Sequence, residues 1–168
     1  MAVEDDLQRF VSDGSRMRRL LRLGYLLTGN EADSADLVQE ALVRVWARPG
    51  HASDIENLEA FLGKTMTRLQ LNRARRERRW REVRGLLLLG RQESPEDQVA
   101  LDDLVVRALG SLTPLQRAAF SLQLFDDLPV KQIAAVLGCS VGGVKRHLAD
   151  ARQRLATELQ VGEKVSKG

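Results

Sequence analysis

The chain has 168 residues, and its 26 Lys and Arg against 23 Asp and Glu give a formal net charge of only +3. A hydrophobic fraction of 43% and a charged fraction of 29% exclude wholesale disorder, while an aromatic fraction of 4% argues against a β-sandwich or barrel. A single cysteine excludes an internal disulfide, no apolar run is long enough to cross a bilayer, and the acidic N-terminus lacks a signal core, so we expect a cytoplasmic protein without membrane insertion.

The N-terminal half has the periodicity of three helices that bury their apolar stripes against one another. The first carries a run of leucines and ends at Gly29, a typical stop residue. The second has an apolar stripe whose last member is Trp46, a predicted core residue, and it stops at Pro49. The third begins at a capping box whose N-cap is Ser53 and runs into an arginine-rich segment over residues 73–80.

The C-terminal half predicts four short helices, each with its own start signal. Ser94 is the N-cap of the first, and Thr113 with Gln116 forms a capping box for the second. Pro129 opens the third helix and Ser140 caps the last. The expected fold class is therefore all-α, with an N-terminal three-helix bundle and a C-terminal four-helix domain joined by a flexible linker. The predicted boundaries are 1–80 and 94–160 for the domains, 81–93 for the linker and 161–168 for a tail.

The spacing of small and apolar residues around Gly138 predicts a helix-turn-helix. Ala134 lets the second helix approach, Gly138 supports the tight turn, and Val144 inserts between the two helices. In this motif the N-terminal end of the last helix enters the DNA major groove. The candidate DNA-contacting residues at that end are Ser140, Gly142, Gly143, Lys145, Arg146 and His147.

The small net charge conceals a strong segregation of charge along the chain. Residues 1–63 carry a net charge of −4, 64–84 carry +7, 85–127 carry −4, and 128–168 carry +4. Two separate basic blocks indicate two contacts with a polyanion. Within the first, arginines at positions 73, 76 and 79 form a stripe that is suited to following a phosphate backbone.

Several motifs together resemble the bacterial RNA polymerase sigma factors. Residues 112–117, 128–134 and 142–145 resemble the C-terminal domain of these proteins, and residues 36–40 (Asp-Leu-Val-Gln-Glu) resemble the helix that sigma factors press onto the polymerase clamp. Phe61 and Leu62, followed by the basic helix through Arg79, resemble the promoter-melting and minus-ten-reading helix. Two such domains and nothing else are typical of the extracytoplasmic-function (ECF) group, and the resemblance covers about residues 7–156.

The resemblance implies a role for each matching segment. It implies polymerase binding by Asp36, Gln39 and Glu40, and minus-thirty-five reading by the helix-turn-helix. For the minus-ten element it implies Arg68, Asn72, Arg73, Arg75, Arg76, Arg78 and Arg79, and for a flipped base it implies the loop residues His51, Ser53, Asp54 and Asn57. The chain departs from the family at Arg68 and Asn72, where sigma factors usually carry Asn and Asp, and at Gly143, where they carry Thr; these departures bear on the promoter sequence that is read.

The function expected is that of an ECF sigma factor that binds core RNA polymerase and promoter DNA. The alternative is a stand-alone helix-turn-helix regulator that binds DNA without polymerase and gives no role to the polar face of residues 36–40. An enzyme finds little support, because the sequence has no Gly-rich phosphate loop, no paired His or Cys ligands and no nucleophile elbow. We expect no metal and no cofactor, and the resemblance adds a possible anti-sigma factor as a partner.

Overall fold

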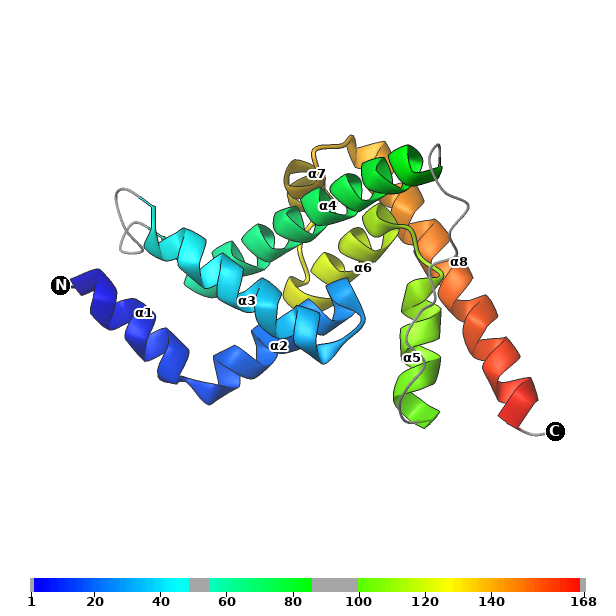
Figure 1. Ribbon diagram of the computed structural model, residues 1–168, viewed down its shortest axis with the longest axis horizontal. Helices are drawn as coiled ribbons and strands as arrows, with labels where there is room; N and C mark the ends of the chain where they lie inside the picture. The colour runs from blue at the N-terminus through cyan, green and yellow to red at the C-terminus, as the bar shows by residue number, and fades with distance from the viewer. Residues whose placement is uncertain (1, 49–54, 86–99, 167–168) are drawn as a thin grey trace.

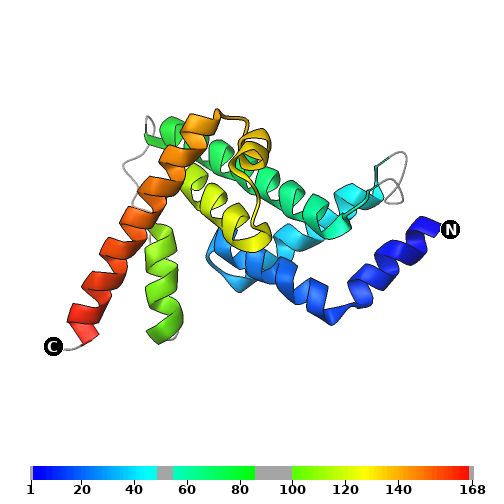
Figure 2. The same cartoon turned by 180° about the vertical axis from the view of Figure 1, so that it is seen from behind.

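A computed structural model describes residues 2–48, 55–85 and 100–166 of the chain (Figure 1). All eight elements in these ranges are α-helices, which confirms the expected fold class. The first and last helices extend to opposite ends of the molecule, and the others pack between them (Figures 1 and 2). No helix within these ranges is both long and apolar enough to span a membrane. The helices are α1 (Ala2–Ser12), α2 (Gly14–Thr28), α3 (Glu31–Trp46), α4 (Leu58–Gly85), α5 (Ala100–Gly110), α6 (Pro114–Asp126), α7 (Val130–Leu137) and α8 (Val141–Ser166).

The predicted stop and start signals determine most helix ends. Gly29 ends α2 with φ of +86°, a left-handed conformation that favours glycine. The next residue, Asn30, then caps α3 by accepting a hydrogen bond of 2.8 Å from the backbone N–H of Asp33. Thr113 and Gln116 form the predicted capping box at the start of α6.

The helix boundaries differ from the expected ones in three places. An additional helix, α1, precedes the predicted bundle, and Asp13 caps the helix that follows it. The arginine-rich α4 continues to Gly85, so residues 81–85 of the expected linker are helical. At the C-terminus α8 continues to Ser166, so the expected tail is helical over most of its length. Residues 81–85 are all exposed, so no apolar stripe marks the continuation of α4. Helix α1, in contrast, buries Leu7 and Phe10, and the sequence reading missed it.

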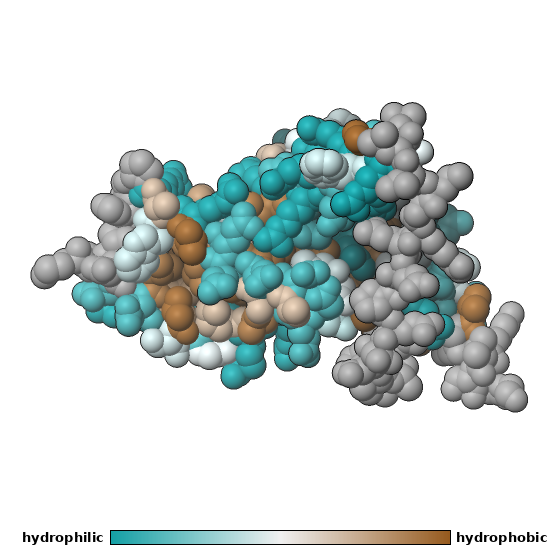
Figure 3. Space-filling model, viewed as in Figure 1, coloured by the Kyte–Doolittle hydropathy of each residue, from teal (hydrophilic) through white to brown (hydrophobic). Residues whose placement is uncertain are grey.

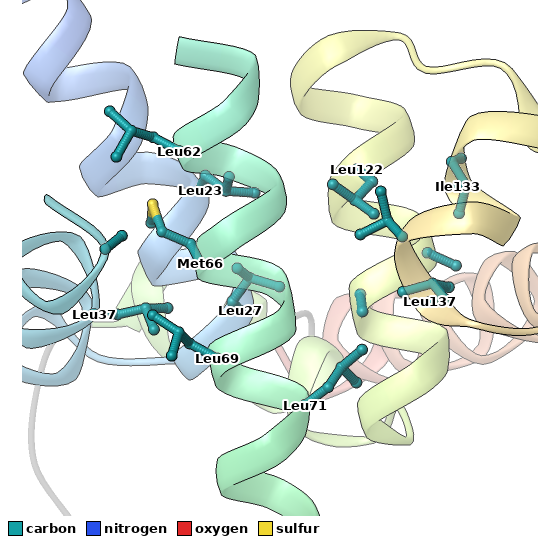
Figure 4. Close-up of a cluster of buried hydrophobic side chains, with 14 of the residues drawn as sticks. Leu23, Leu27, Leu37, Leu62, Met66, Leu69, Leu71, Leu122, Ile133 and Leu137 are labelled. Carbon is teal, nitrogen blue, oxygen red and sulfur yellow. The ribbon is translucent and has the colours of Figure 1, made fainter. Parts of the chain in front are cut away.

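The two halves of the chain share one hydrophobic core. Leu27 and Leu71 from the N-terminal half belong to the same buried cluster as Leu122, Ile133 and Leu137 from the C-terminal half. Figure 4 shows the side chain of Leu71 pointing from α4 toward α6. The predicted domains are therefore packed against each other through α2, α4, α6 and α7.

Polar contacts also cross between the two halves. The guanidinium of Arg19 on α2 donates a hydrogen bond of 3.2 Å to the backbone carbonyl of Phe125 and lies 5.2 Å from the centre of that ring. Its Nε also lies 3.1 Å from a carboxylate oxygen of Glu59. Arg117 on α6 is half-buried beside the end of α2, and its desolvation lowers the pKa of the guanidinium.

The close approach of α2 to α3 depends on Gly24. A Cβ atom at this position would lie 2.4 Å from Ser34 Oγ, which donates a hydrogen bond of 2.7 Å to the carbonyl of Leu21. We therefore expect G24A to lower the free energy of unfolding by about 1–3 kcal/mol, measured by urea denaturation, because the added methyl group forces the helices apart. The matched control is G110A, since a Cβ there meets nothing within 4 Å and should cost no stability. Equal losses in the two variants would contradict the packing argument.

Candidate nucleic-acid interface

The second half of α4 presents a row of arginines to solvent. Arg68 and Asn72 are exposed, and so are Arg75, Arg76 and Arg79 farther along the helix. Glutamates four residues away pair with Arg78 and Arg81 at 3.4 and 3.5 Å. Among the described residues the guanidiniums at positions 75, 76 and 79 have no ion pair, so their charge is available to a phosphate backbone. In Figure 3 the surface in the region of α4 is largely hydrophilic.

Arg73 differs from the other arginines of the predicted stripe. It is half-buried and forms an ion pair with Glu40 on α3, a residue assigned by the sequence to polymerase binding. The other carboxylate oxygen of Glu40 lies 3.2 Å from Arg44 Nη2. The hydrogen bond from Arg73 is the main cause that lowers the pKa of Glu40, and Arg44 adds to it. Asp36 and Gln39, in contrast, are exposed on α3.

The predicted helix-turn-helix is present in α7 and α8. Ala134 and Val144 are buried at the contact between the two helices, and Gly138 has φ of +66° at the turn. Ser140 caps α8 by accepting a hydrogen bond of 3.0 Å from the backbone N–H of Gly143. The turn, its cap and its buried contacts therefore agree with the geometry of a DNA-reading motif.

The residues at the start of α8 do not all face outward. Gly142, Lys145 and Arg146 are exposed, whereas His147 is half-buried. Gly143 is buried, and a Cβ atom there would lie 3.2 Å from Ser140 Oγ. A side chain at position 143 would thus contact the turn first, so this position of the predicted DNA-contacting set lies against the turn and does not face outward.

The predicted flipped-base loop is described only at its end. His51, Ser53 and Asp54 lie outside the described residues, so the predicted Ser53 cap does too. Asn57 is exposed and caps α4 by accepting a hydrogen bond of 3.0 Å from the backbone N–H of Ala60. Sequence reasoning missed Arg48, whose guanidinium lies 5.2 Å from the centre of the Phe61 ring at the start of α4.

The prediction that Trp46 is a core residue is wrong. Its side chain is 57% exposed, beside an apolar groove of about 370 Å³ between α1 and α3. Val11 of α1 and Val43 of α3 are exposed on the same groove. The stripe of α3 turns with the helix, so its last member leaves the core that the first members define.

Comparisons with known proteins match both halves of the chain to one family. The family described as Sigma-70 region 2 matches residues 15–80, and Sigma-70, region 4, matches residues 102–155. RNA polymerase sigma-E factor of Streptomyces avermitilis is 32% identical over 153 residues, which cover 87% of this chain and 82% of that protein. ECF RNA polymerase sigma factor SigL of Mycobacterium tuberculosis is 32% identical over 146 residues, 84% of this chain and 82% of that protein. The chain belongs to the ECF group of the sigma-70 family.

A solved structure supports the fold of this sigma factor over nearly its whole length. The sigma factor RpoE of Bartonella quintana, determined in complex with the anti-sigma factor NepR, aligns with a TM-score of 0.66 and 26% identity. The alignment covers 95% of this chain and 99% of that one. The family resemblance inferred from the sequence is thus confirmed, and both basic segments of the sigma factor lie inside the matched regions or at their edge.

The lowered pKa of Glu40 makes the stability of the sigma factor depend on pH. The folded state binds this proton less tightly than the unfolded state, so the ion pair stabilises the fold above the ordinary pKa of 4.5. Its contribution is lost as the pH falls through the lowered folded-state value. We expect E40Q to reduce stability by less than about 1 kcal/mol at neutral pH, because the pair is partly exposed.

This difference between E40Q and the wild type should disappear in acid, where Glu40 itself is protonated. Thermal unfolding at neutral pH and at about pH 3 measures it. The control is E82Q, which removes a far more exposed pair with Arg78 and should change little at either pH. An E40Q deficit that stays constant with pH would contradict the assignment.

Proposed function

We propose that this sigma factor binds core RNA polymerase through α3 and promoter DNA through α4 and α8, and that it directs promoter-specific transcription initiation without catalysing a reaction of its own. One observation carries the proposal. An exposed polar face on α3 and two exposed basic segments occur on the regions that match Sigma-70 regions 2 and 4. A stand-alone regulator, the alternative from the sequence, gives no role to α3 and does not explain the match to region 2.

The polymerase contact is assigned to the polar face of α3. Asp36 and Gln39 are exposed there and lie on the side of the helix away from its buried stripe. An exposed carboxylate and an amide suit the polar rim of a protein interface. Glu40 completes the set, although in this structure both its carboxylate oxygens are engaged within the chain.

The two DNA contacts are assigned to the two basic segments. The arginines of α4, together with Arg68, Asn72 and the loop before the helix, would contact the minus-ten element. The start of α8 would enter the major groove at the minus-thirty-five element, with Lys145 and Arg146 as its exposed cations. In this arrangement α4 contributes affinity for phosphates, while the helix-turn-helix contributes sequence readout.

Location and regulation follow from these partners. Core polymerase and chromosomal promoters are cytoplasmic in bacteria, so we place the protein there. The structural relative from Bartonella quintana was solved with an anti-sigma factor. We propose that a protein of this class also binds the present sigma factor.

Charge reversal on α3 tests the polymerase contact. We expect D36K to abolish co-purification with core polymerase and promoter-dependent transcription, because it places a cation on the proposed rim contact. The matched control is E31K on the same helix, since position 31 lies roughly 140° around the helix from position 36. Retention of polymerase by D36K would contradict the assignment of this face.

Salt dependence tests the contact of α4 with phosphates. We expect R76Q to reduce the slope of log affinity against log salt by about 0.7–0.9 for promoter binding by the polymerase complex, because one phosphate contact is lost. The control is R152Q on α8, because Arg152 donates a hydrogen bond of 2.7 Å to Gln123 within the chain. The same slope for R76Q and wild type would exclude Arg76 from the DNA contact.

A further inference from the structure

The ion pair between Glu40 and Arg73 joins two surfaces that are assigned to different partners. Glu40 lies on α3 with the proposed polymerase-binding residues, and Arg73 lies on α4 at the start of the proposed DNA-binding stripe. The carboxylate has one oxygen toward Arg73 and the other toward Arg44. A group of another protein that binds Glu40 must therefore compete with the guanidinium of Arg73. The same guanidinium is a candidate ligand for a DNA phosphate.

The side chain of Arg73 is less accessible to solvent than those of the other paired arginines of α4. Its side chain is 30% exposed, whereas the side chains of Arg78 and Arg81 are 82% and 69% exposed. Those two pair with glutamates of α4 itself, so their ion pairs move with the helix that carries them. The partner of Arg73 comes from another helix, 33 residues earlier in the chain. Of these three ion pairs, only the one between Arg73 and Glu40 links α4 to α3, so only this one can respond to a partner that binds α3.

We propose that Glu40 holds Arg73 away from DNA in the free sigma factor and that polymerase, by engaging Glu40, releases Arg73 to a phosphate of the minus-ten region. This inference rests on the proposed function, because it takes α3 as the polymerase contact and α4 as a DNA contact. It assigns Glu40 as a positioning residue for DNA binding in addition to its place on the polymerase face.

The charges explain why the release needs a partner. In the free chain the carboxylate neutralises Arg73, and binding a phosphate would require giving up that ion pair. A cationic group of polymerase at Glu40 replaces Arg73 as the second counter-charge beside Arg44, so the guanidinium becomes available without loss of an ion pair at Glu40. Partly exposed pairs of this kind are worth about 0.2–1 kcal/mol, which corresponds to a change in affinity of up to about fivefold.

The first experiment measures binding of a short fluorescent single-stranded oligonucleotide by the free full-length chain. We expect E40A to bind about two- to fivefold more tightly than wild type, and its salt slope to be steeper by about 0.7, because one more cation contacts phosphate. The matched control is D36A, which removes the same charge from the same helix face, where no ion pair of Asp36 is found among the described residues.

A double-mutant cycle separates release of Arg73 from the general effect of removing a negative charge. In an R73Q background, E40A should give no larger gain than D36A. If E40A and D36A give equal gains with Arg73 present, the proposal is wrong. If E40A weakens DNA binding, the ion pair serves only to position α4 and the proposal is also overturned.

The second experiment tests whether polymerase causes the release. We expect R73Q to cost less than about twofold in DNA affinity in the free chain and about fivefold in the complex with core polymerase. R76Q is the matched control, because Arg76 is exposed and has no ion pair among the described residues, so its cost should be the same in both states. Equal costs of R73Q in the two states would falsify release by polymerase.

Failure of this proposal can be distinguished from failure of the proposed function. Loss of polymerase by D36K establishes the α3 contact independently of Arg73, and the oligonucleotide measurements need no polymerase. A sigma factor that passes the D36K test but shows no E40A gain would keep its function and lose only the coupling.

Discussion

Helix α4 is buried along its first half by neighbours from both ends of the chain, and this burial determines how the rest of the molecule is arranged. Leu62, Met66 and Leu69 lie in the core that α2 and α3 cover. Leu71, farther along the same helix, extends toward α6. Because α4 packs against helices of both halves, it holds α3 and α6 in place relative to each other in this structure. Beyond Leu71 only Arg73 and Ala74 are partly buried and the other residues of α4 are exposed. All arginines of α4 except Arg68 lie in this part of the helix.

The local features of the sequence predicted helix ends well because each end depends on one or two residues. The left-handed glycines at positions 29 and 138 and the capping box at Thr113 need no distant partner, so their signals are readable in a single sequence. The same is true of the helix-turn-helix, whose three spacing residues lie within one short segment.

Contacts between distant segments could not be read in the same way. Leu71 and Ala118 look like ordinary members of helical stripes, and nothing in their spacing says that one stripe is buried against the other. The pairing of Glu40 with Arg73 was missed for the same reason, since each residue fits its own surface when considered alone. Family resemblance supplied roles for both residues but not their proximity, which is a property of how α3 crosses α4.

The contact between α4 and α7 is very short compared with the distance between the two promoter elements. The names of the two promoter elements place them about 25 base pairs apart, and at 3.4 Å per base pair this is roughly 85 Å of duplex. On the proposed assignment, α4 and the helix-turn-helix of α7 and α8, which are in contact here, must reach sites separated by about three diameters of a small domain. The segment from 86 to 99 can span at most roughly 50 Å when fully extended, so the remaining reach must come from the dimensions of the two domains and the path of the DNA. Separation of the two halves would also expose the apolar sides of α4, α6 and α7 to solvent. A partner that binds these sides in the separated state needs an apolar surface of its own.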